Sequence, residues 1–305
     1  MGRKRTGLPI NGWVVLDKPL GLSSAQAVAA VRRTTGAAKA GHGGTLDPLA
    51  TGILPIALGE ATKTVSFVMD GAKTYRFRAQ WGESRSTDDN EGEIVGISPN
   101  RPTKEAILGV LPRFEGNIEQ IPPVFSALKV DGERAYALAR AGNAPELAPR
   151  RVQIDKITLL ATETDWADFE VRCGKGTYIR SLARDLGQAL GTLAFVAELR
   201  RTACGPFTEI QAISLDTLGV FVHSAASFVL PVATALDDIP ALAVTEDEAQ
   251  CLSRGQPIPV LGPDGIRVSA ANLRDTVVRV QTADRLVALA RIDDDMVRPV
   301  RVLHL

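Results

Sequence analysis

The sequence predicts an α+β fold, because strand-like and helix-like segments are mixed without the regular rhythm of a parallel βαβ protein. Residues 75–81 alternate strictly between two sets of side chains, and residues 169–173 do the same, as half-buried strands do. A helix is expected after the second strand, over about residues 178–190. Four apolar side chains recur there at helical spacing: Ile179, Leu182, Leu186 and Leu190.

Another helix is predicted nearer the N-terminus, over residues 23–36. Ser23 or Ser24 can cap its beginning, and Gly36 can end it. A glycine-rich loop follows at residues 41–52. The predicted helix therefore leads directly into the segment with the most unusual composition in the chain.

Two segments interrupt the predicted strands. Residues 83–93 are acidic and are expected to form a loop. Residues 120–150 are rich in Pro, Ala, Gly and Arg, which indicates an insertion between core strands. A short helix is predicted within this insertion, near residues 133–141.

A domain boundary is predicted near residues 231–240, where two prolines bracket the Asp237-Asp238 pair. Beyond it, short β-like runs separated by turn residues indicate a small β-barrel or sandwich, over 276–281, 286–292 and 297–303. We therefore expect a first domain over residues 1–236 and a second over residues 237–305.

Composition favours a folded, soluble protein. The chain has 305 residues, 45% of them hydrophobic, which suits roughly two domains with real cores. Its apolar runs are broken well short of the ~20 residues that a membrane span needs, and no signal-peptide core follows the basic N-terminus. A cytoplasmic protein is expected. Three scattered cysteines and three histidines indicate neither a disulfide framework nor a metal centre.

Charge is balanced overall but uneven along the chain. Formal net charge is zero, which taken alone argues weakly against a nucleic-acid partner. Residues 1–46, however, carry seven Lys/Arg and one acid, and residues 172–201 carry six Lys/Arg and two acids. One face of the protein could therefore meet a polyanion. Solvated surface charge explains the same runs equally simply.

The glycine-rich loop contains the candidate catalytic group, Asp47. Glycines before it allow tight backbone geometry, and Pro48 stiffens the residue that follows. A carboxylate on such a loop, above flanking leucines, suits catalysis. The alternative is that Asp47 caps a helix that begins at Pro48, and local composition and spacing favour this alternative. A glycosidase-type pair of Asp47 with Asp88 or Asp89 also stays open.

The loop also carries a family resemblance. The run Gly-His-Gly-Gly-Thr-Leu-Asp-Pro-Leu-Ala-Thr-Gly at residues 41–52, followed by Gly-Glu-Ala-Thr-Lys at 59–63, resembles the signature of the TruB family of tRNA pseudouridine synthases. Three further blocks resemble that family in the expected order, at 119–142, 173–187 and 199–202. The resemblance covers about residues 9–215. The C-terminal part is loosely similar to the PUA-like RNA-binding domain of bacterial members.

The resemblance implies a fold and an activity. The fold would be a mixed, mainly antiparallel sheet flanked by helices, with residues 120–150 gripping RNA and a small C-terminal PUA-like β-barrel. The activity would be isomerisation of uridine 55 in the tRNA T-loop to pseudouridine, by cleavage of the glycosidic bond, rotation of the base and formation of a C-glycoside. It implies no cofactor and no metal. The implied partner is the T-arm of tRNA, and the protein would act as a monomer without an obligate protein partner.

The resemblance also implies which residues serve the reaction. Asp47 would be the catalytic carboxylate, with Arg180 as its ionic partner and Tyr75 stacked on the uracil. The substrate-binding residues implied by the family are Tyr178 and Leu199 at the pocket, His42 and Asp89 at the extruded nucleotides, and Lys63 and Lys129 at phosphates. Further candidate phosphate contacts are Arg140, Arg151 and Lys175.

Each role has a plainer alternative. Tyr75 could be a core residue beside Phe77, Arg180 an exposed helix residue, and Tyr178 an aromatic at a helix end. A non-catalytic RNA-binding or folding factor would need only the basic patches and the C-terminal domain. A sugar-polymer glycosidase is the least favoured function, because aromatic residues make up only 5% of the chain.

Overall fold

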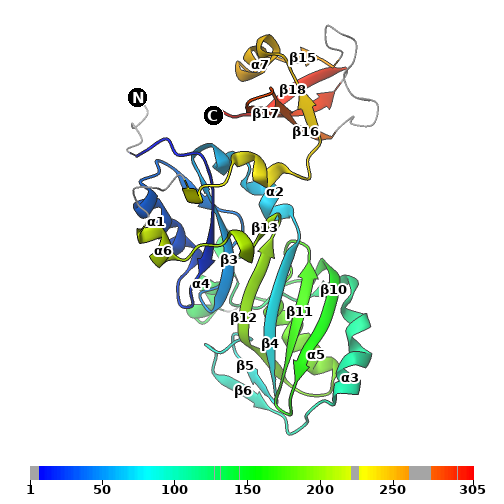
Figure 1. Ribbon diagram of the computed structural model, residues 1–305. Helices are drawn as coiled ribbons and strands as arrows, with labels where there is room; N and C mark the ends of the chain where they lie inside the picture. Colours follow the sequence, from blue (N-terminus) through cyan, green and yellow to red (C-terminus); the bar gives the residue numbers. More distant parts are fainter. Residues whose placement is uncertain are drawn as a thin grey trace.

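The structure is a computed structural model that describes residues 7–126, 128–130, 132–143, 145–220, 227–260, 276–293 and 295–305. A large sheet with helices behind it forms the main body, and a smaller β domain lies at one end of it (Figure 1). Among the described residues, no helix is long and apolar enough to cross a membrane.

The main body is built on a nine-stranded sheet with the order β1-β3-β12-β4-β11-β10-β7, in which β2 pairs with β3 and β13 with β12. Its strands are β1 (Gly12–Lys18), β2 (Ala40–His42), β3 (Ala50–Leu58), β4 (Lys73–Trp81), β7 (Gly116–Gln120), β10 (Arg150–Thr162), β11 (Trp166–Cys173), β12 (Ala194–Cys204) and β13 (Phe207–Thr208). Only β3 and β12 run parallel among its described pairs. The predicted mixed, mainly antiparallel sheet is confirmed.

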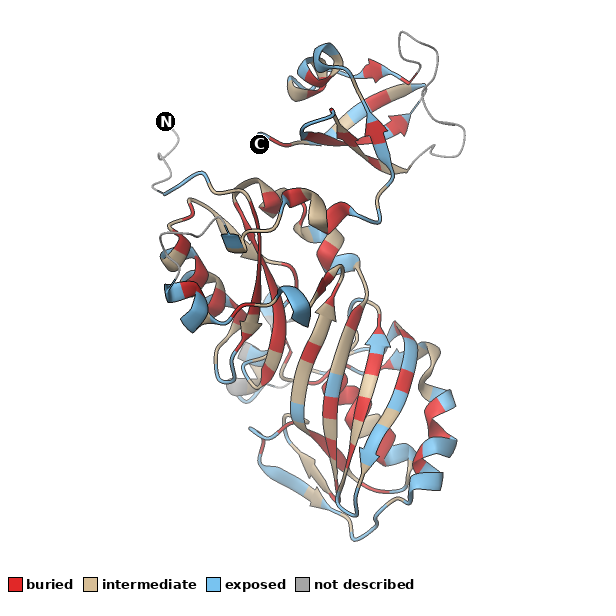
Figure 2. Cartoon of the chain, in the orientation of Figure 1, coloured by how far each residue is buried: buried red, intermediate tan, exposed pale blue. Residues whose placement is uncertain are grey.

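The two alternating segments form neighbouring central strands. Phe77 of β4 lies opposite Phe169 of β11, and their rings stack with centroids 5.2 Å apart. Burial alternates along both strands (Figure 2), because successive side chains point to opposite faces of a sheet. The inward face packs against α5 (Ile179–Ala189), which buries Leu182 and Leu186. The predicted helix after β11 is therefore confirmed.

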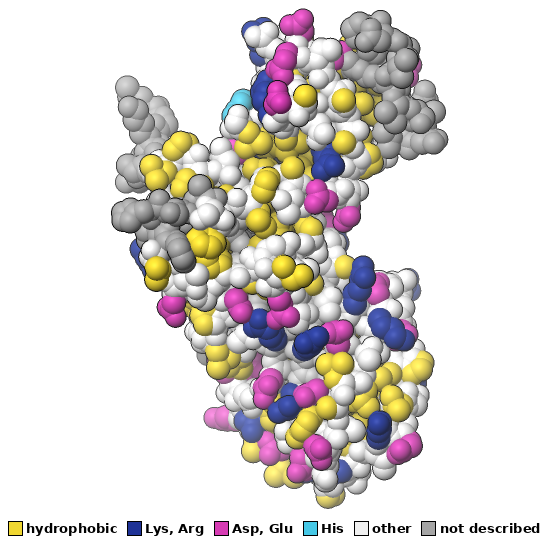
Figure 3. Space-filling view, viewed as in Figure 1, with side chains coloured by type: hydrophobic (Ala, Val, Ile, Leu, Met, Phe, Trp, Pro, Cys, Tyr) yellow, Lys and Arg dark blue, Asp and Glu magenta, His cyan; other side chains and the backbone are white. Residues whose placement is uncertain are grey.

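The opposite face of the sheet carries paired charges. Arg76 Nε lies 2.9 Å from Glu170, and Arg78 Nε lies 2.8 Å from Asp168. Figure 3 shows basic and acidic side chains intermixed over this part of the surface. A phosphate backbone would therefore meet little net positive charge on this face.

The remaining helices cover the sheet and its ends. They are α1 (Ser24–Thr35), α2 (Val65–Asp70), α3 (Lys104–Val110) and α6 (Leu215–Val220), with 3-10 turns η1 (Gly59–Lys63), η2 (Leu111–Phe114), η3 (Glu209–Gln211) and η5 (Val232–Leu236). In α1 the Ser23 side chain accepts a hydrogen bond from the Gln26 amide, and Gly36 ends the helix at φ 67°. Both predicted ends of this helix are confirmed.

The two predicted interruptions are found, one of them with a different start. The segment from residue 83 opens with a strand, β5 (Glu83–Arg85), which pairs with β6 (Ile94–Ile97), so only residues 86–93 form the loop. The strand was missed because its three residues, Glu-Ser-Arg, are all polar and show no apolar alternation, although its partner strand is apolar. The insertion contains β8 (Lys129–Val130), β9 (Glu133–Arg134) and the predicted short helix, α4 (Ala135–Arg140).

The C-terminal residues form a five-stranded sheet, in the order β14-β16-β17-β18-β15, that curls into a half-barrel. Its elements are β14 (Ala241–Ala243), α7 (Glu246–Ser253), β15 (Ile258–Pro259), β16 (Val277–Gln281), β17 (Leu286–Asp293) and β18 (Met296–Val302). All three predicted strands are present. The closed barrel is not formed by the described strands, because the short β14 and β15 lie at opposite edges.

A polar clasp and an apolar contact join the two parts of the chain. The Lys63 ammonium donates to Glu60 (2.7 Å) and to the Val302 carbonyl (2.8 Å), and the His304 amide donates to Glu60 (2.9 Å). Leu289 and Leu303 extend the core that surrounds Trp13 and Phe207. The C-terminal sheet is therefore fixed against η1 rather than tethered by its linker alone.

This clasp generates a pH-dependent prediction. Burial alone would raise the pKa of Glu60, but hydrogen bonds from Lys63 and the His304 amide outweigh it, so the pKa is lowered. Docking is then complete above the unfolded pKa of about 4.3 and is lost as pH falls through the lower folded pKa. Glu60→Gln should weaken docking by about 1 kcal/mol at neutral pH. Hydrogen exchange of the His304 amide measures this loss. Glu170→Gln, which breaks an ion pair on the sheet, should leave that exchange rate unchanged.

Candidate active site

Asp47 lies in a tight turn between two strands of the main sheet. The chain leaves β2 at His42, passes through Gly43 and Gly44, and enters β3 at Ala50, whose amide donates to the Asp47 carbonyl at 3.0 Å. No helix begins at Pro48, so the helix-cap alternative is wrong. The glycine at position 43 is needed, because a Cβ there would lie 2.8 Å from the Val68 side chain.

Arg201 locks the start of this turn. It is 1% exposed, and its guanidinium donates to three carbonyls, Ile53 (2.7 Å), Thr45 (3.3 Å) and Gly44 (3.0 Å). The sequence analysis did not single out Arg201. Its position could have indicated it: Arg201 lies two residues after Leu199 on one strand, so both side chains point to the same face and line the same cavity.

Lys18 and Ser24 lock the other end of the turn. The Lys18 ammonium donates to the carbonyls of Leu22 (2.8 Å) and Pro48 (3.3 Å), and burial lowers the pKa of Lys18 to about 8, against the opposing effect of Asp47. The Ser24 hydroxyl donates to the Leu46 carbonyl at 2.9 Å and accepts from the Leu46 amide at 2.8 Å. Neither residue was predicted to lie at the site. Together with Arg201 they hold the turn through buried polar groups on both sides of Asp47.

Arg180 joins the turn to two other segments. Its guanidinium lies 2.8 Å from the Asp47 carboxylate, and the Arg180 side chain is 7% exposed against 42% for Asp47. It also donates to the carbonyls of Thr87 and Phe125, both at 2.9 Å. The structure thus brings together the predicted carboxylate and its predicted partner. The exposed-helix alternative for Arg180 is wrong.

Asp89 is directed toward Arg180. Its carboxylate lies 3.4 Å from the Arg180 guanidinium and accepts from the Glu91 amide at 3.1 Å. The neighbouring Asp88 takes a left-handed backbone, φ 59°, and pairs with Arg184 at 3.0 Å. Two arginines one turn apart on α5 therefore clasp two successive aspartates, and Asp89 supports the site from beside Arg180.

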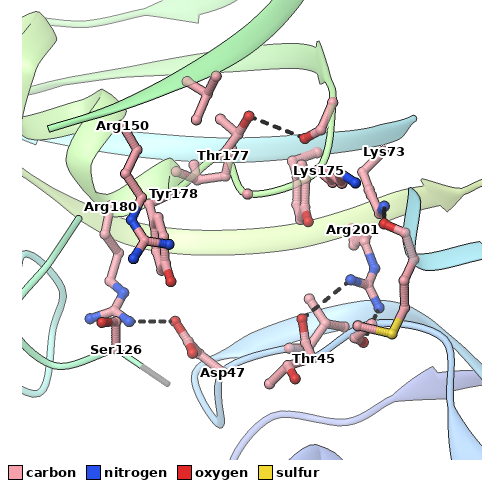
Figure 4. Close-up of a pocket in the computed structure, with 18 of the residues that line it drawn as sticks. Thr45, Asp47, Lys73, Ser126, Arg150, Lys175, Thr177, Tyr178, Arg180 and Arg201 are labelled. Atoms are coloured by element: carbon pink, nitrogen blue, oxygen red, sulfur yellow. Dashed lines mark hydrogen bonds and ion pairs between the residues drawn. The ribbon is translucent and has the colours of Figure 1, made fainter. Parts of the chain in front are cut away.

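A cavity of about 600 Å³ opens beside this ion pair (Figure 4). Asp47, Tyr75, Tyr178 and Leu199 all line it, as predicted for a shared pocket. Burial raises the pKa of Tyr75 to about 12, partly opposed by the charge of Arg201, so the phenol is protonated at neutral pH. Six basic residues line the same cavity: Lys73, Arg150, Arg151, Lys175, Arg180 and Arg201.

A second cavity of about 860 Å³ adjoins the first, and His42, Asp89 and Tyr136 are among the residues that line it. The two cavities share five lining residues, Thr45, Leu46, Asp47, Ser126 and Arg180. Burial, and then the charge of Arg201, lower the pKa of His42. The imidazole is therefore neutral near pH 7.

One predicted phosphate contact, Lys63, lies elsewhere. Lys63 does not line either cavity, and its ammonium is held by Glu60 and Val302 at the contact with the C-terminal sheet. The side chains of Lys129 and Arg140 lie outside the described part of the structure. Among the described residues, no group of three or more His, Cys, Asp or Glu side chains could hold a metal ion.

The site can therefore perform carboxylate chemistry in a partly enclosed pocket. Asp47 has a fixed backbone, a cationic partner and a side chain open to the cavity. Tyr75 and Leu199 offer apolar surface on which a flat ring can pack. Basic residues at the same cavity suit an anionic substrate.

Two family models match the chain. Residues 32–179 match the model of the TruB family pseudouridylate synthase N-terminal domain. Residues 180–237 match that of the tRNA pseudouridylate synthase B C-terminal domain. Together they span the turn, the whole first cavity and α5, and all of the second cavity's lining except Ser23, Ser24 and Ala25.

Whole-chain relatives agree with these models. A protein of Bradyrhizobium diazoefficiens named tRNA pseudouridine synthase B is 54% identical, over 99% of this chain and 88% of its own length. One of Rhodospirillum rubrum with the same name is 51% identical over the full length of both. Among solved structures, a Cbf5-Nop10-Gar1 complex has a chain that is similar with a TM-score of 0.75 and 27% identity, covering 100% of this chain and 90% of that one.

The Arg201 contacts generate a stability prediction. Arg201→Met should lower the free energy of unfolding by about 3 kcal/mol, because three buried carbonyls lose their donor. Arg201→Lys should lose less, since one ammonium keeps some of these bonds. Urea unfolding followed by tryptophan fluorescence measures the change.

Arg200 provides the matched control. It is the preceding residue of β12 but points outward to Asp17 and Glu209, with its side chain 35% exposed. Arg200→Met should therefore cost less than about 1 kcal/mol. Equal losses for the two variants would contradict the role assigned to Arg201.

Proposed function

This chain belongs to the TruB family of pseudouridylate synthases, and on that premise we propose that it isomerises uridine 55 in the T-loop of tRNA to pseudouridine. The observation that supports this proposal best is the 2.8 Å pair of Asp47 and Arg180 in the wall of a cavity that also holds Tyr75. Several relatives with about half of their residues identical carry the name tRNA pseudouridine synthase B.

The reaction needs a carboxylate but no net change in atoms. The bond between N1 of uracil and C1′ breaks, the base turns, and C5 bonds to C1′. The proton on C5 leaves, and N1 gains one. A covalent route and a glycal-type route both need a carboxylate beside C1′ or C6. Asp47 has this place in our proposal, since its carboxylate lines the cavity and is paired with the buried Arg180.

Arg180 and Tyr75 then take complementary roles. The Arg180 guanidinium neutralises the carboxylate charge and fixes its direction. Tyr75 stacks on the uracil, and its protonated phenol can exchange a proton with the base. Leu199 closes the pocket wall, and Tyr178 packs beside the ion pair.

A uridine stacked in an RNA loop cannot reach this pocket without leaving the stack, at a cost of a few kcal/mol. We assign His42 to the space that the uridine leaves, and Asp89 to the side of the second cavity that faces the extruded nucleotides. Arg150, Arg151 and Lys175 would contact phosphates at the first cavity. The substrate is thus the T-arm of tRNA, recognised by its shape.

The wider assignments follow from this substrate. We assign residues 1–236 to catalysis and residues 237–305 to a PUA-like domain that adds RNA contacts. The site is completed by one chain, so the protein can act as a monomer, without a protein partner or a cofactor. A tRNA substrate implies work in the cytoplasm.

Asp47→Asn tests the function directly. The variant should form pseudouridine at least on the order of 10³-fold more slowly, because the reacting carboxylate is lost, while tRNA binding stays within a few-fold. The measurement is nucleoside analysis after incubation with an unmodified T-arm transcript. Asp165→Asn, at a surface carboxylate paired with Arg101, is the control and should keep full activity. Near-normal turnover by Asp47→Asn would defeat the assignment.

Salt dependence separates phosphate contacts from structural lysines. Arg150→Gln should reduce the slope of log affinity against log salt by about one, because one phosphate contact is lost. Lys63→Gln should leave the slope unchanged, since its ammonium already binds Glu60 and Val302. Filter binding of the T-arm at several salt concentrations gives both slopes. A reduced slope for Lys63→Gln would restore its predicted role at a phosphate.

A further inference from the structure

Ser126 lies in the wall between the two cavities. It belongs to the insertion, and both cavities include it among their lining residues. Its backbone is fixed, because its amide donates to the Val124 carbonyl at 3.0 Å and its carbonyl accepts from the Tyr136 amide at 3.1 Å. Figure 4 shows it beside Arg180, at the end of the pocket marked by the Asp47 pair.

The Ser126 hydroxyl is enclosed but lacks a hydrogen bond of good geometry. The residue is 3% exposed, and no described group meets its Oγ at hydrogen-bonding geometry. Burial raises the pKa of Tyr178, and a weak hydrogen-bonding interaction with Ser126 partly opposes this, so the Tyr178 phenol is the one described group that interacts with the Ser126 hydroxyl. Ser24 and Ser181, also buried, both donate to carbonyls. A buried hydroxyl without a well-aligned partner lacks a hydrogen bond worth about 1 kcal/mol, so one that borders two cavities is placed to bind a ligand atom.

The position of Ser126 indicates which part of a nucleotide it meets. Tyr75, Leu199 and Arg201 line the first cavity but not the second, so the base lies on that side. Asp47 must reach C1′ or C6, and it stands in the shared wall together with Ser126. The sugar therefore passes this wall. The hydroxyl next to C1′ on the ribose is the 2′-hydroxyl, which can both donate and accept.

We propose that the Ser126 hydroxyl binds the 2′-hydroxyl of the target nucleotide and makes the site prefer ribose over deoxyribose. This inference rests on the proposed function, because it requires a nucleotide with its base beside Tyr75. The fixed backbone of Ser126 supports it, since a hydroxyl held in place loses little freedom when its partner arrives.

The test compares two T-arm stem-loops that differ only at the target, uridine or 2′-deoxyuridine. Affinity is measured by fluorescence anisotropy in an Asp47→Asn background, which removes turnover. The parent protein should bind the ribose form on the order of fivefold more tightly, the worth of one hydrogen bond. With Ser126→Ala this preference should fall close to one. Ser126→Cys, nearly the same size but a weak hydrogen-bond former, should behave alike and serves if the alanine variant does not fold.

Ser181→Ala is the matched control, because it also removes a buried hydroxyl from this region but lines neither cavity. It should keep the full ribose preference. An unchanged preference in both Ser126 variants, or an equal loss of affinity for both sugars, would overturn the inference. Wild-type turnover of the ribose stem-loop is measured in parallel. An inactive wild type would sink the proposed function and this inference together, whereas an active one with unchanged preference sinks the inference alone.

Discussion

The site depends on one buried guanidinium, that of Arg180. It contacts three segments far apart in the chain, through the Asp47 carboxylate, the Thr87 carbonyl with the Asp89 carboxylate, and the Phe125 carbonyl. A charge so enclosed is costly unless it is paired and hydrogen-bonded, so all three segments must be in place for the fold to accept it. The Asp47 carboxylate is thus oriented by the same contacts that bring together the turn, the loop at residues 86–93 and the insertion.

The sequence predicted the fold wherever the signal was local. Alternation in residues 75–81 and helical spacing after residue 178 indicate which face of each element is buried. The structure has a strand and a helix at these places, β4 and α5, with those faces in the core. Local signals failed at Asp47, where spacing favoured a helix cap. The segment from Ala50 is instead a strand between β1 and β12. Eight of its nine residues are buried there, by strands whose paired residues lie 34–46 positions away on one side and about 150 on the other. The closeness of Asp47 to Arg180 came from the family resemblance, since no pattern relates residues 133 apart.

The two basic segments, residues 1–46 and 172–201, suggested a surface that could meet a polyanion, but part of their positive charge is used inside the fold. Lys18, Arg180 and Arg201 contributed to the local excess of positive charge, yet all three are buried and donate to backbone carbonyls or carboxylates of the fold. Their burial follows from contacts across the sheet that no local window contains. The positive charge available to an RNA backbone is therefore smaller than the count of Lys and Arg implied. It is found at the first cavity, on residues such as Arg150, whereas the Lys175 ammonium there lies 2.9 Å from the Asp70 carboxylate.

Because the turn that carries Asp47 is held firmly, the RNA substrate rather than the protein has to change shape when the two bind. Lys18, Ser24 and Arg201 fix the backbone on both sides of Asp47, so the carboxylate cannot move outward to meet a stacked base. The substrate must instead bring its nucleotide into the cavity and accept the cost of unstacking, a few kcal/mol. Contacts away from the reacting atoms, at phosphates and at the sugar, can offset that cost. Rigidity in the protein thus makes base extrusion a requirement of the geometry, and it favours an RNA whose target already lies in a loop.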